Sequence, residues 1–392
     1  MAQDRYDVVV VGGGATGSAT AWALARSGHR VALVEERTSL AETGLDLVRL
    51  GHADPDRTRL ALLAHQWWQI LEQESGAELL TLTGCVEHGP VEALRPLVET
   101  LLVSDIPFEY LTGPEASARW PWMAFDDRVV VQPVAGVADA ARAVLTLQEQ
   151  AALHGAELRR GTRAVRVERL DDGVRVHVTH AGPPDPLAWG GDAVAEVSTL
   201  DAQAVVVTAG ARSAELLDDV VVLPPSRSVR DHRVGGTSAG SAPRDQGPAF
   251  VHRVDPAAHG SARGSLGPDD GYPEVGVRGY HAPDGTLAVV SRTDAVDRAA
   301  LDGYAAAWLP GVTLTAGPAT TTARTDGPIV LDRLGRVVVG VGLGVHGVAF
   351  APGTGHVLAT LAEDALGFAR LYDDPDQFDR GPFALTTLVD AV

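Results

Sequence analysis

The first apolar run of the chain leads into a series of glycines, and together they predict a strand, a tight turn and a helix. Residues 8–11 predict a buried strand, and Gly12, Gly14 and Gly17 follow it. Gly12 lets the chain turn sharply, Gly14 lets backbone approach a pyrophosphate, and Gly17 lets the helix pack close to the sheet. The next predicted strand ends at Glu35, a carboxylate placed to accept hydrogen bonds from a ribose. The pattern predicts that this turn binds an adenine dinucleotide through the amides of the helix N-terminus.

Hydrophobic periodicity along the rest of the chain predicts a mixed α/β protein without internal repeats. Helical spacing predicts helices at 56–75, 138–154, 297–308 and 355–367, with a short one before residue 217. Apolar runs or alternation predict strands at 30–34, 163–168, 173–179, 204–208, 274–280, 287–291 and 337–341. Two stretches rich in glycine or proline predict an exposed hairpin tip at 182–192 and a segment leaving the first domain at 224–248.

Composition and charge narrow the class of protein. The 392 residues suffice for two domains with a large core, and 45% are hydrophobic. No apolar run is long enough to span a bilayer, and the first strand starts too early for a signal peptide, so we expect a cytoplasmic enzyme. The formal charge of −19 argues against binding nucleic acid or an anionic membrane surface, since both need a basic footprint.

The chain has one cysteine and no lysine, and both facts exclude chemistry. Cys85 alone cannot form an internal disulfide or a cysteine-based metal cluster, and we expect no metal centre. All 32 basic residues are arginines. A mechanism that needs a lysine ammonium or Schiff base is therefore ruled out.

Several further segments, taken together, resemble the D-amino-acid oxidase superfamily of flavoproteins, and within it the group of monomeric sarcosine oxidase and N-methyltryptophan oxidase. The resemblance covers nearly the whole chain. It rests on the N-terminal glycines with Glu35, on the segment around Arg49, and on segments 82–89, 205–210, 279–281, 325–329 and 342–355.

The resemblance implies FAD as cofactor and a Rossmann-like FAD-binding domain interleaved with an antiparallel-sheet substrate domain. The FAD-binding domain would take residues 1–80, 135–225 and 315–392, and the substrate domain 81–134 and 226–314. The Gly353-Thr354-Gly355 turn independently favours a flavin, because we expect it to start a helix whose amides stabilise negative charge at flavin N1 and the C2 oxygen. A nicotinamide ring has no use for such amides.

The predicted site has a cofactor part and a catalytic part. The predicted FAD-binding residues are Gly12, Gly14, Ala15, Thr16, Gly17, Glu35, Glu36, Arg37, Val165, Gly210, Gly344, His346, Gly347, Gly353, Thr354 and Gly355. The catalytic candidates are His346, His281, Arg49 and Arg278. His346 and His281 match family histidines near the flavin, whereas Arg49 matches a family arginine that binds a substrate carboxylate or a charge beside the flavin. Each of these three residues also has a structural alternative. His346 could be a hydrogen-bonded loop histidine without a role at the flavin, His281 a structural histidine at a strand end, and Arg49 part of a surface salt bridge.

Three positions depart from the family pattern. Ala319 stands where sarcosine oxidases carry the cysteine that binds FAD covalently, so we expect noncovalent FAD. Val277 stands at the oxygen-activating lysine, and Ala349 at the lysine that holds the substrate carboxylate. Arg278 could take over either lysine's role, although the strand period aims it at the face opposite Val277.

These observations predict an FAD-dependent amine oxidoreductase that transfers a hydride from an atypical amine, imino acid or amino acid to flavin N5. Its expected partners are this amine and oxygen or another electron acceptor, and the expected state is a monomer. One alternative is a flavin dehydrogenase with a non-oxygen acceptor, which the missing lysine favours. Another is a flavin-binding protein without turnover, and a nicotinamide dehydrogenase is a further one.

Overall fold

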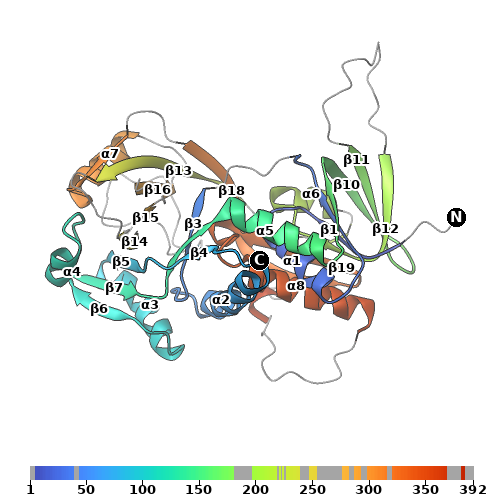
Figure 1. The fold of residues 1–392 in the computed structure, drawn as a ribbon, viewed down its shortest axis with the longest axis horizontal. Helices are drawn as coiled ribbons and strands as arrows, with labels where there is room; N and C mark the ends of the chain where they lie inside the picture. The colour runs from blue at the N-terminus through green and yellow to red at the C-terminus, as the bar shows by residue number, and fades with distance from the viewer. Residues whose placement is uncertain are drawn as a thin grey trace, which may run out of the picture.

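The protein has two lobes that share one long mixed sheet (Figure 1). The computed structural model describes residues 5–38, 44–180, 197–218, 220–221, 223–224, 227–238, 247–253, 276–281, 287–292, 298–315, 320–368 and 381–384. All statements about the fold concern these residues.

A parallel sheet forms the core of the right-hand lobe in Figure 1. Its strands, in spatial order, are β9 (Glu157–Arg160), β2 (Val31–Glu35), β1 (Tyr6–Val11), β12 (Val197–Val207) and β19 (Val337–Leu343). The valine-rich β1 is buried on both faces, as expected of a central parallel strand.

Helices cover one face of this sheet, and an antiparallel hairpin with a short helix covers the other. The helical layer consists of α1 (Ala15–Arg26), α2 (Pro55–Ser75), α5 (Ala140–Leu153) and α8 (Ala351–Leu366). The opposite layer consists of β10 (Thr162–Arg169), β11 (Val174–His180) and α6 (Ser213–Leu217), which follows the 3₁₀ turn η1 (Gly210–Arg212). Trp22 and Trp68 are fully buried in the helical layer, where the indole of Trp68 donates to the Ala349 carbonyl over 3.0 Å.

The left-hand lobe continues the sheet in a mainly antiparallel arrangement, with one parallel pair, β5 and β14. In spatial order its strands are β6 (Glu109–Thr112), β7 (Arg128–Gln132), β5 (Cys85–Gly89), β14 (Ala249–Arg253), β15 (Gly276–His281), β16 (Leu287–Arg292) and β13 (Arg227–Ser238), to which β17 (Val312–Leu314) also pairs. Its helices are α3 (Val91–Val103), α4 (Gly113–Arg119) and α7 (Arg298–Trp308).

Strand β18 (Thr320–Leu334) joins the lobes, because it pairs with β13 at its start and with β19 at its end. A second sheet of β3 (Leu45–Val48), β8 (Gly136–Asp139) and β4 (Leu80–Thr81) lies near this junction, and the short turn η3 (Gly381–Phe383) packs against β18. The two faces of the left-hand sheet therefore differ. The inner face packs with β3 and β8, and the outer face packs with α4 and α7.

Most predicted elements are present near their expected bounds. The helix predicted at 56–75 is α2, which Asp54 caps by accepting from the amides of Asp56 and Arg57, and which ends at Gly76 with φ 68°. The stretch 182–192 lies outside the described residues.

One expectation was wrong, and one segment contains a strand that the sequence analysis did not predict. The final helix starts at Ala351 rather than Gly355, because Gly353 and Gly355 pack inside it. The polar stretch 224–248 contains β13, which forms because β16 and β18 supply partners on both sides.

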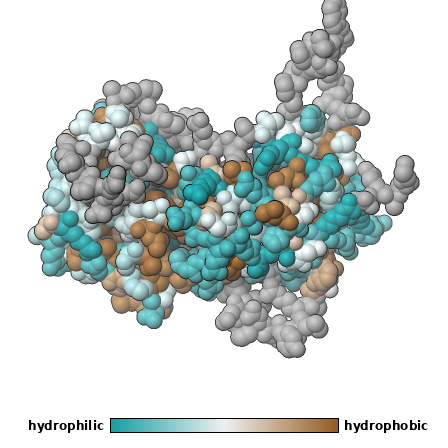
Figure 2. Space-filling model, in the orientation of Figure 1, coloured by the Kyte–Doolittle hydropathy of each residue, from teal (hydrophilic) through white to brown (hydrophobic). Residues whose placement is uncertain are grey.

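The surface seen in Figure 2 mixes hydrophilic and apolar residues, and apolar ones gather at the lower left. Leu102 and Val103, near the end of α3, have exposed side chains. Among the described helices, none is long and apolar enough to cross a membrane.

Candidate active site

The turn after β1 is held in shape by close backbone contacts. Gly12 has φ 103°, and a Cβ built on it would lie 2.6 Å from the carbonyl oxygen of Thr208. A Cβ on Gly17 would lie 1.8 Å from the oxygen of Gly12. Both glycines are therefore required by the fold, and Gly17 brings α1 against the strand as predicted.

Gly14 differs from its neighbours because the space beside it is open. It is the N-cap residue of α1, it supplies no side-chain cap, and a Cβ built on it would meet no atom within 4 Å. Ala15 and Thr16 follow as the first helical residues, whose amides have no intrahelical acceptor. An open, uncapped helix N-terminus favours an anionic group such as a pyrophosphate.

The acidic residues at the end of β2 have different partners. The Glu35 carboxylate accepts from the amide of Gly13 over 2.6 Å and from that of Arg37 over 2.9 Å, which places it beside the glycine turn. Glu36 forms an ion pair of 2.7 Å with Arg212, and the Arg37 side chain is exposed. Glu35 is thus the acid of this pair that could reach a ribose held at the turn.

Gln148 of α5 supports the same turn and was missed by the sequence analysis. Its buried amide donates to the carbonyl of Gly13 over 2.9 Å and to the hydroxyl of Ser18 over 3.1 Å, while its oxygen accepts from Arg160. A glutamine in a helix 135 residues away carries no local signal for this contact.

A second backbone segment, predicted at Gly210, approaches the turn from β12. Thr208 donates its amide to the carbonyl of Val11, and Gly210 has φ 57° with open space beside it. Val165, also predicted to bind the cofactor, is partly exposed at a β-bulge where the register of β10 shifts.

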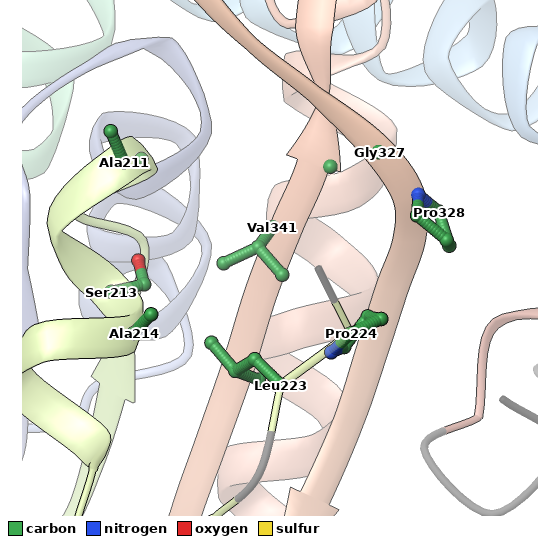
Figure 3. A pocket seen from close by; sticks show the side chains of 10 residues that line it. Ala211, Ser213, Ala214, Leu223, Pro224, Gly327, Pro328 and Val341 are labelled. Atoms are coloured by element: carbon green, nitrogen blue, oxygen red, sulfur yellow. The ribbon is translucent and has the colours of Figure 1, made fainter. Parts of the chain in front are cut away.

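A small cavity lies beside this segment, between η1–α6 and the strands β18 and β19. Figure 3 shows Ala211, Ser213 and Ala214 on one side of it, with Val341 and Leu223 opposite. Its volume of about 20 Å³ admits one water molecule and is far too small for a flavin ring. The cavity therefore adjoins the predicted site without being the cofactor pocket.

The first turn of α8 packs tightly against two other helices. A Cβ on Gly353 would lie 2.7 Å from Cα of Ala64, and one on Gly355 would lie 2.5 Å from Cβ of Ala19. The Thr354 hydroxyl is buried and donates back to helix carbonyls. Of Gly353, Thr354 and Gly355, only Gly353, in the first turn, has an amide without an intrahelical acceptor.

His346 lies in the 3₁₀ turn η2 (Gly344–His346), which opens with Gly344 at φ 50° and continues into Gly347. Its ring stacks on Phe350 at 4.9 Å and meets the ring of His52 edge-on at 5.1 Å. His52, buried and three residues after Arg49, was missed by the sequence analysis. The structure thus brings the Arg49 segment to the His346 loop.

Arg49 takes part in a buried charge cluster. Its guanidinium donates to Oε1 of Glu87 over 2.7 Å, and Arg253 donates two hydrogen bonds to Oε2, of 2.9 and 2.7 Å. Glu87 is fully buried and also accepts from Gln132 over 2.7 Å. Two guanidinium groups thus donate to one buried carboxylate. The surface salt bridge considered for Arg49 is wrong.

The two candidates on β15 face opposite ways. Arg278 pairs in register with Val251 and Val290, which belong to the inner apolar cluster near β3. His281 lies on the outer face, edge-on to Trp122 at 5.3 Å, and burial lowers its pKa. The structure therefore places Arg278, and not His281, on the side of the Arg49 cluster.

The positions that depart from the family are buried where the structure describes them. Val277 packs on the outer face, and Ala349 lies in the core of the helical layer. Burial raises the pKa of the Cys85 thiol far above its usual range, which keeps it from acting as a nucleophile. Ala319 lies outside the described residues.

Comparison with known proteins supports the cofactor interpretation. The family model described as "DAO: FAD dependent oxidoreductase" matches residues 7–361. Monomeric sarcosine oxidase from a Bacillus species is 24% identical over 91% of this chain and 92% of its own length. N-methyl-L-tryptophan oxidase from Yersinia pestis is 24% identical over 92% of this chain and 95% of its own.

Solved structures share the fold at lower sequence identity. NikD, described as an unusual amino acid oxidase essential for nikkomycin biosynthesis, aligns in its open form with a TM-score of 0.73 and 21% identity, covering 97% of this chain and 98% of NikD. Glycine oxidase from Geobacillus kaustophilus aligns with a TM-score of 0.72 and 19% identity, covering 98% and 99%. These similarities confirm the predicted Rossmann-like fold class.

Proposed function

The chain belongs to the DAO family of FAD dependent oxidoreductases, and from this membership we propose that it oxidises the C–N bond of a secondary amine, imino acid or amino acid to an imine. Its similarity to oxidases named for sarcosine and for N-methyl-L-tryptophan supports a reacting carbon next to nitrogen. The observation that carries the proposal is the open, uncapped N-terminus of α1 at Gly14, beside the Glu35 carboxylate.

The residues of this chain mainly bind and orient. FAD, when bound, supplies the acceptor for a hydride equivalent. The first amides of α1 would hold the pyrophosphate, and Glu35 the ribose. We assign to the imidazoles of His346 and His52, which lie edge-on to each other, the acceptance of a proton from the substrate amine before oxidation. The Arg49 guanidinium would favour negative charge on the ring system or on the substrate.

We place substrate recognition on the inner face of the left-hand sheet. Ala349 is buried in the core, so no anchor for a carboxylate exists at that position. Arg278 and Arg233 both extend from the inner face in register with Val290, and Arg233 stacks over the ring of Tyr280 at 5.4 Å. This arrangement supports an amine substrate that carries a carboxylate.

Anaerobic mixing with a panel of secondary amines and amino acids tests the function. Bleaching of the flavin absorbance by at least one carboxylate-bearing amine is the expected result. If no amine bleaches the flavin, the chain is the flavin-binding protein without turnover, and the proposal fails.

Replacing Arg278 by methionine should raise KM for that substrate by roughly 10- to 150-fold, with a smaller change in kcat, because a charge-assisted hydrogen bond contributes about 1.5–3 kcal/mol. Steady-state kinetics measure the effect. The matched control is Arg175→Met. It removes an arginine of β11 that forms an ion pair with Asp201 of β12. Equal KM values in both variants would contradict the role of Arg278.

A second candidate function is a flavin dehydrogenase, which passes electrons to an acceptor other than oxygen. Val277 packs among apolar side chains at the position of the family lysine, and no lysine exists elsewhere in the chain. This observation favours a dehydrogenase that reduces a quinone or partner protein. The test uses an amine that bleaches the flavin and compares the rate of oxygen consumption with the rate of reduction of an artificial acceptor. Faster oxygen consumption would indicate an oxidase, and faster reduction of the artificial acceptor would indicate a dehydrogenase.

Acid precipitation should release the flavin colour into the supernatant, because Ala319 offers no thiol for a covalent bond. Absorbance of the supernatant and of the redissolved pellet measures the two fractions. Colour retained in the pellet would mean that another residue holds the flavin covalently.

A further inference from the structure

A second group of polar side chains lies on the outer face of the left-hand sheet, away from the candidate active site. His88 of β5 and His252 of β14 pair in register on neighbouring parallel strands, and both point to the side of α4 and α7. Their rings stack with centroids 4.0 Å apart. Asp126, in the loop before β7, completes the group.

Both imidazoles are directed at one carboxylate oxygen. Nδ1 of His88 lies 3.0 Å from Oδ2 of Asp126, and Nε2 of His252 lies 3.1 Å from the same atom. The three ligand atoms all lie within 4.8 Å of one another. Ligand atoms around a tetrahedral zinc ion are separated by roughly 3.3 Å, since each lies about 2.0–2.1 Å from the metal. The two nitrogen–oxygen distances of the cluster are close to that separation.

We propose that His88, Asp126 and His252 bind a divalent transition-metal ion. Two imidazoles and one carboxylate suit zinc and its first-row neighbours, whereas magnesium prefers oxygen ligands alone. The proposal replaces the expectation of no metal that the sequence alone suggested.

An outer partner orients one of the two histidines. Nδ1 of His252 lies 3.3 Å from the hydroxyl of Tyr304 on α7, which can orient the ring as outer partners of metal-bound histidines do.

The cluster reaches the surface through one ligand. His88 and His252 are buried, whereas the Asp126 side chain retains 25% exposure. A water molecule would take the fourth position that three protein ligands leave open. A bound ion would tie β5 and β14 to the loop before β7 and so stabilise the left-hand lobe.

Metal content of the untagged holoenzyme tests the proposal, because a histidine tag would itself bind zinc. After equilibration with zinc and dialysis into metal-free buffer, we expect one zinc ion per flavin by elemental analysis, and none after the same treatment with magnesium replacing zinc. Zinc should also raise the thermal midpoint of the wild-type protein.

Two variants at the cluster and one control complete the experiment. Asp126→Asn and His252→Gln should retain their flavin, lose the zinc ion and show no zinc-dependent rise in thermal midpoint. His177→Gln should behave as the wild type, because His177 pairs with Glu168 alone on the surface of β11. Wild-type protein that holds no more zinc than Asp126→Asn would overturn the proposal, whatever the enzyme's activity.

Discussion

Replacing Glu87 by glutamine should lower the free energy of unfolding by about 3–5 kcal/mol, because the change removes the charged partner of a buried ion cluster. The Glu87 carboxylate is fully buried and accepts two hydrogen bonds from Arg253, one from Arg49 and one from Gln132. A neutral amide keeps the shape but not the charge, and both guanidinium groups then lack their shared carboxylate. Urea denaturation of the flavin-bound protein measures the loss.

A surface pair and a charge-balanced variant serve as comparisons. Glu168→Gln breaks the half-exposed contact with His177 and should cost far less than Glu87→Gln, because solvent screens an exposed pair. Arg253→Met leaves one arginine for one carboxylate, so it should destabilise less than Glu87→Gln does. An unfolding free energy for Glu87→Gln within 1 kcal/mol of wild type would show that the cluster is not charge-dependent.

The same cluster connects stability with the site. Gln132 accepts from the amide of Gly51 over 2.8 Å and donates to its carbonyl over 3.2 Å, which fixes the segment between Arg49 and His52. Loss of the Glu87 charge would therefore also disturb the position of His52 against His346.

The N-terminal part of the site could be predicted because its signals are local. Gly12, Gly14 and Gly17 stand within one turn and one helix start, and Glu35 ends the very next strand. Each of these features follows from backbone geometry over a few residues. The position of Asp54 before α2 is equally local.

The remaining parts depend on contacts that no local pattern encodes. Glu87 and Arg253 lie 166 residues apart and meet because β5 and β14 become neighbours. Gly353 and Gly355 read as a turn in the sequence, yet they lie inside α8, where the approach of Ala64 and Ala19 leaves no space for side chains. Helix α3 was missed because Pro96, in its interior, argues locally against a helix.

The side on which a strand residue points was only partly predictable. Alternation along β15 correctly separated Arg278 from Val277, because side chains in a strand point to alternate faces. Which of the two faces is turned toward the other lobe is decided by β3 and β8, which pack against the inner face. Because of this packing, His281 lies on the outer face, next to Trp122, and not on the face of the sheet that is turned toward the other lobe.

Replacing Gly14 by valine should abolish FAD binding while leaving the fold intact. The N-cap backbone of Gly14 is extended, with φ −69° and ψ −174°, a conformation that suits valine, and its Cβ position is open to 4 Å. The only conflict is therefore with a ligand at the helix N-terminus. We expect affinity for FAD to fall by at least about 100-fold, equivalent to 2.8 kcal/mol at about 1.4 kcal/mol per factor of ten.

The control is Gly303→Val on α7, where the added side chain also meets no atom within 4 Å and lies on an exposed face. Titration of the apoprotein with FAD, followed by flavin fluorescence, measures affinity, and circular dichroism confirms folding. Gly12→Val is not a suitable comparison, because φ of 103° and the contact with Thr208 would disturb the turn itself. A folded Gly14→Val protein that binds FAD as tightly as Gly303→Val would mean that the pyrophosphate lies elsewhere, and the glycine turn would then have a structural role alone.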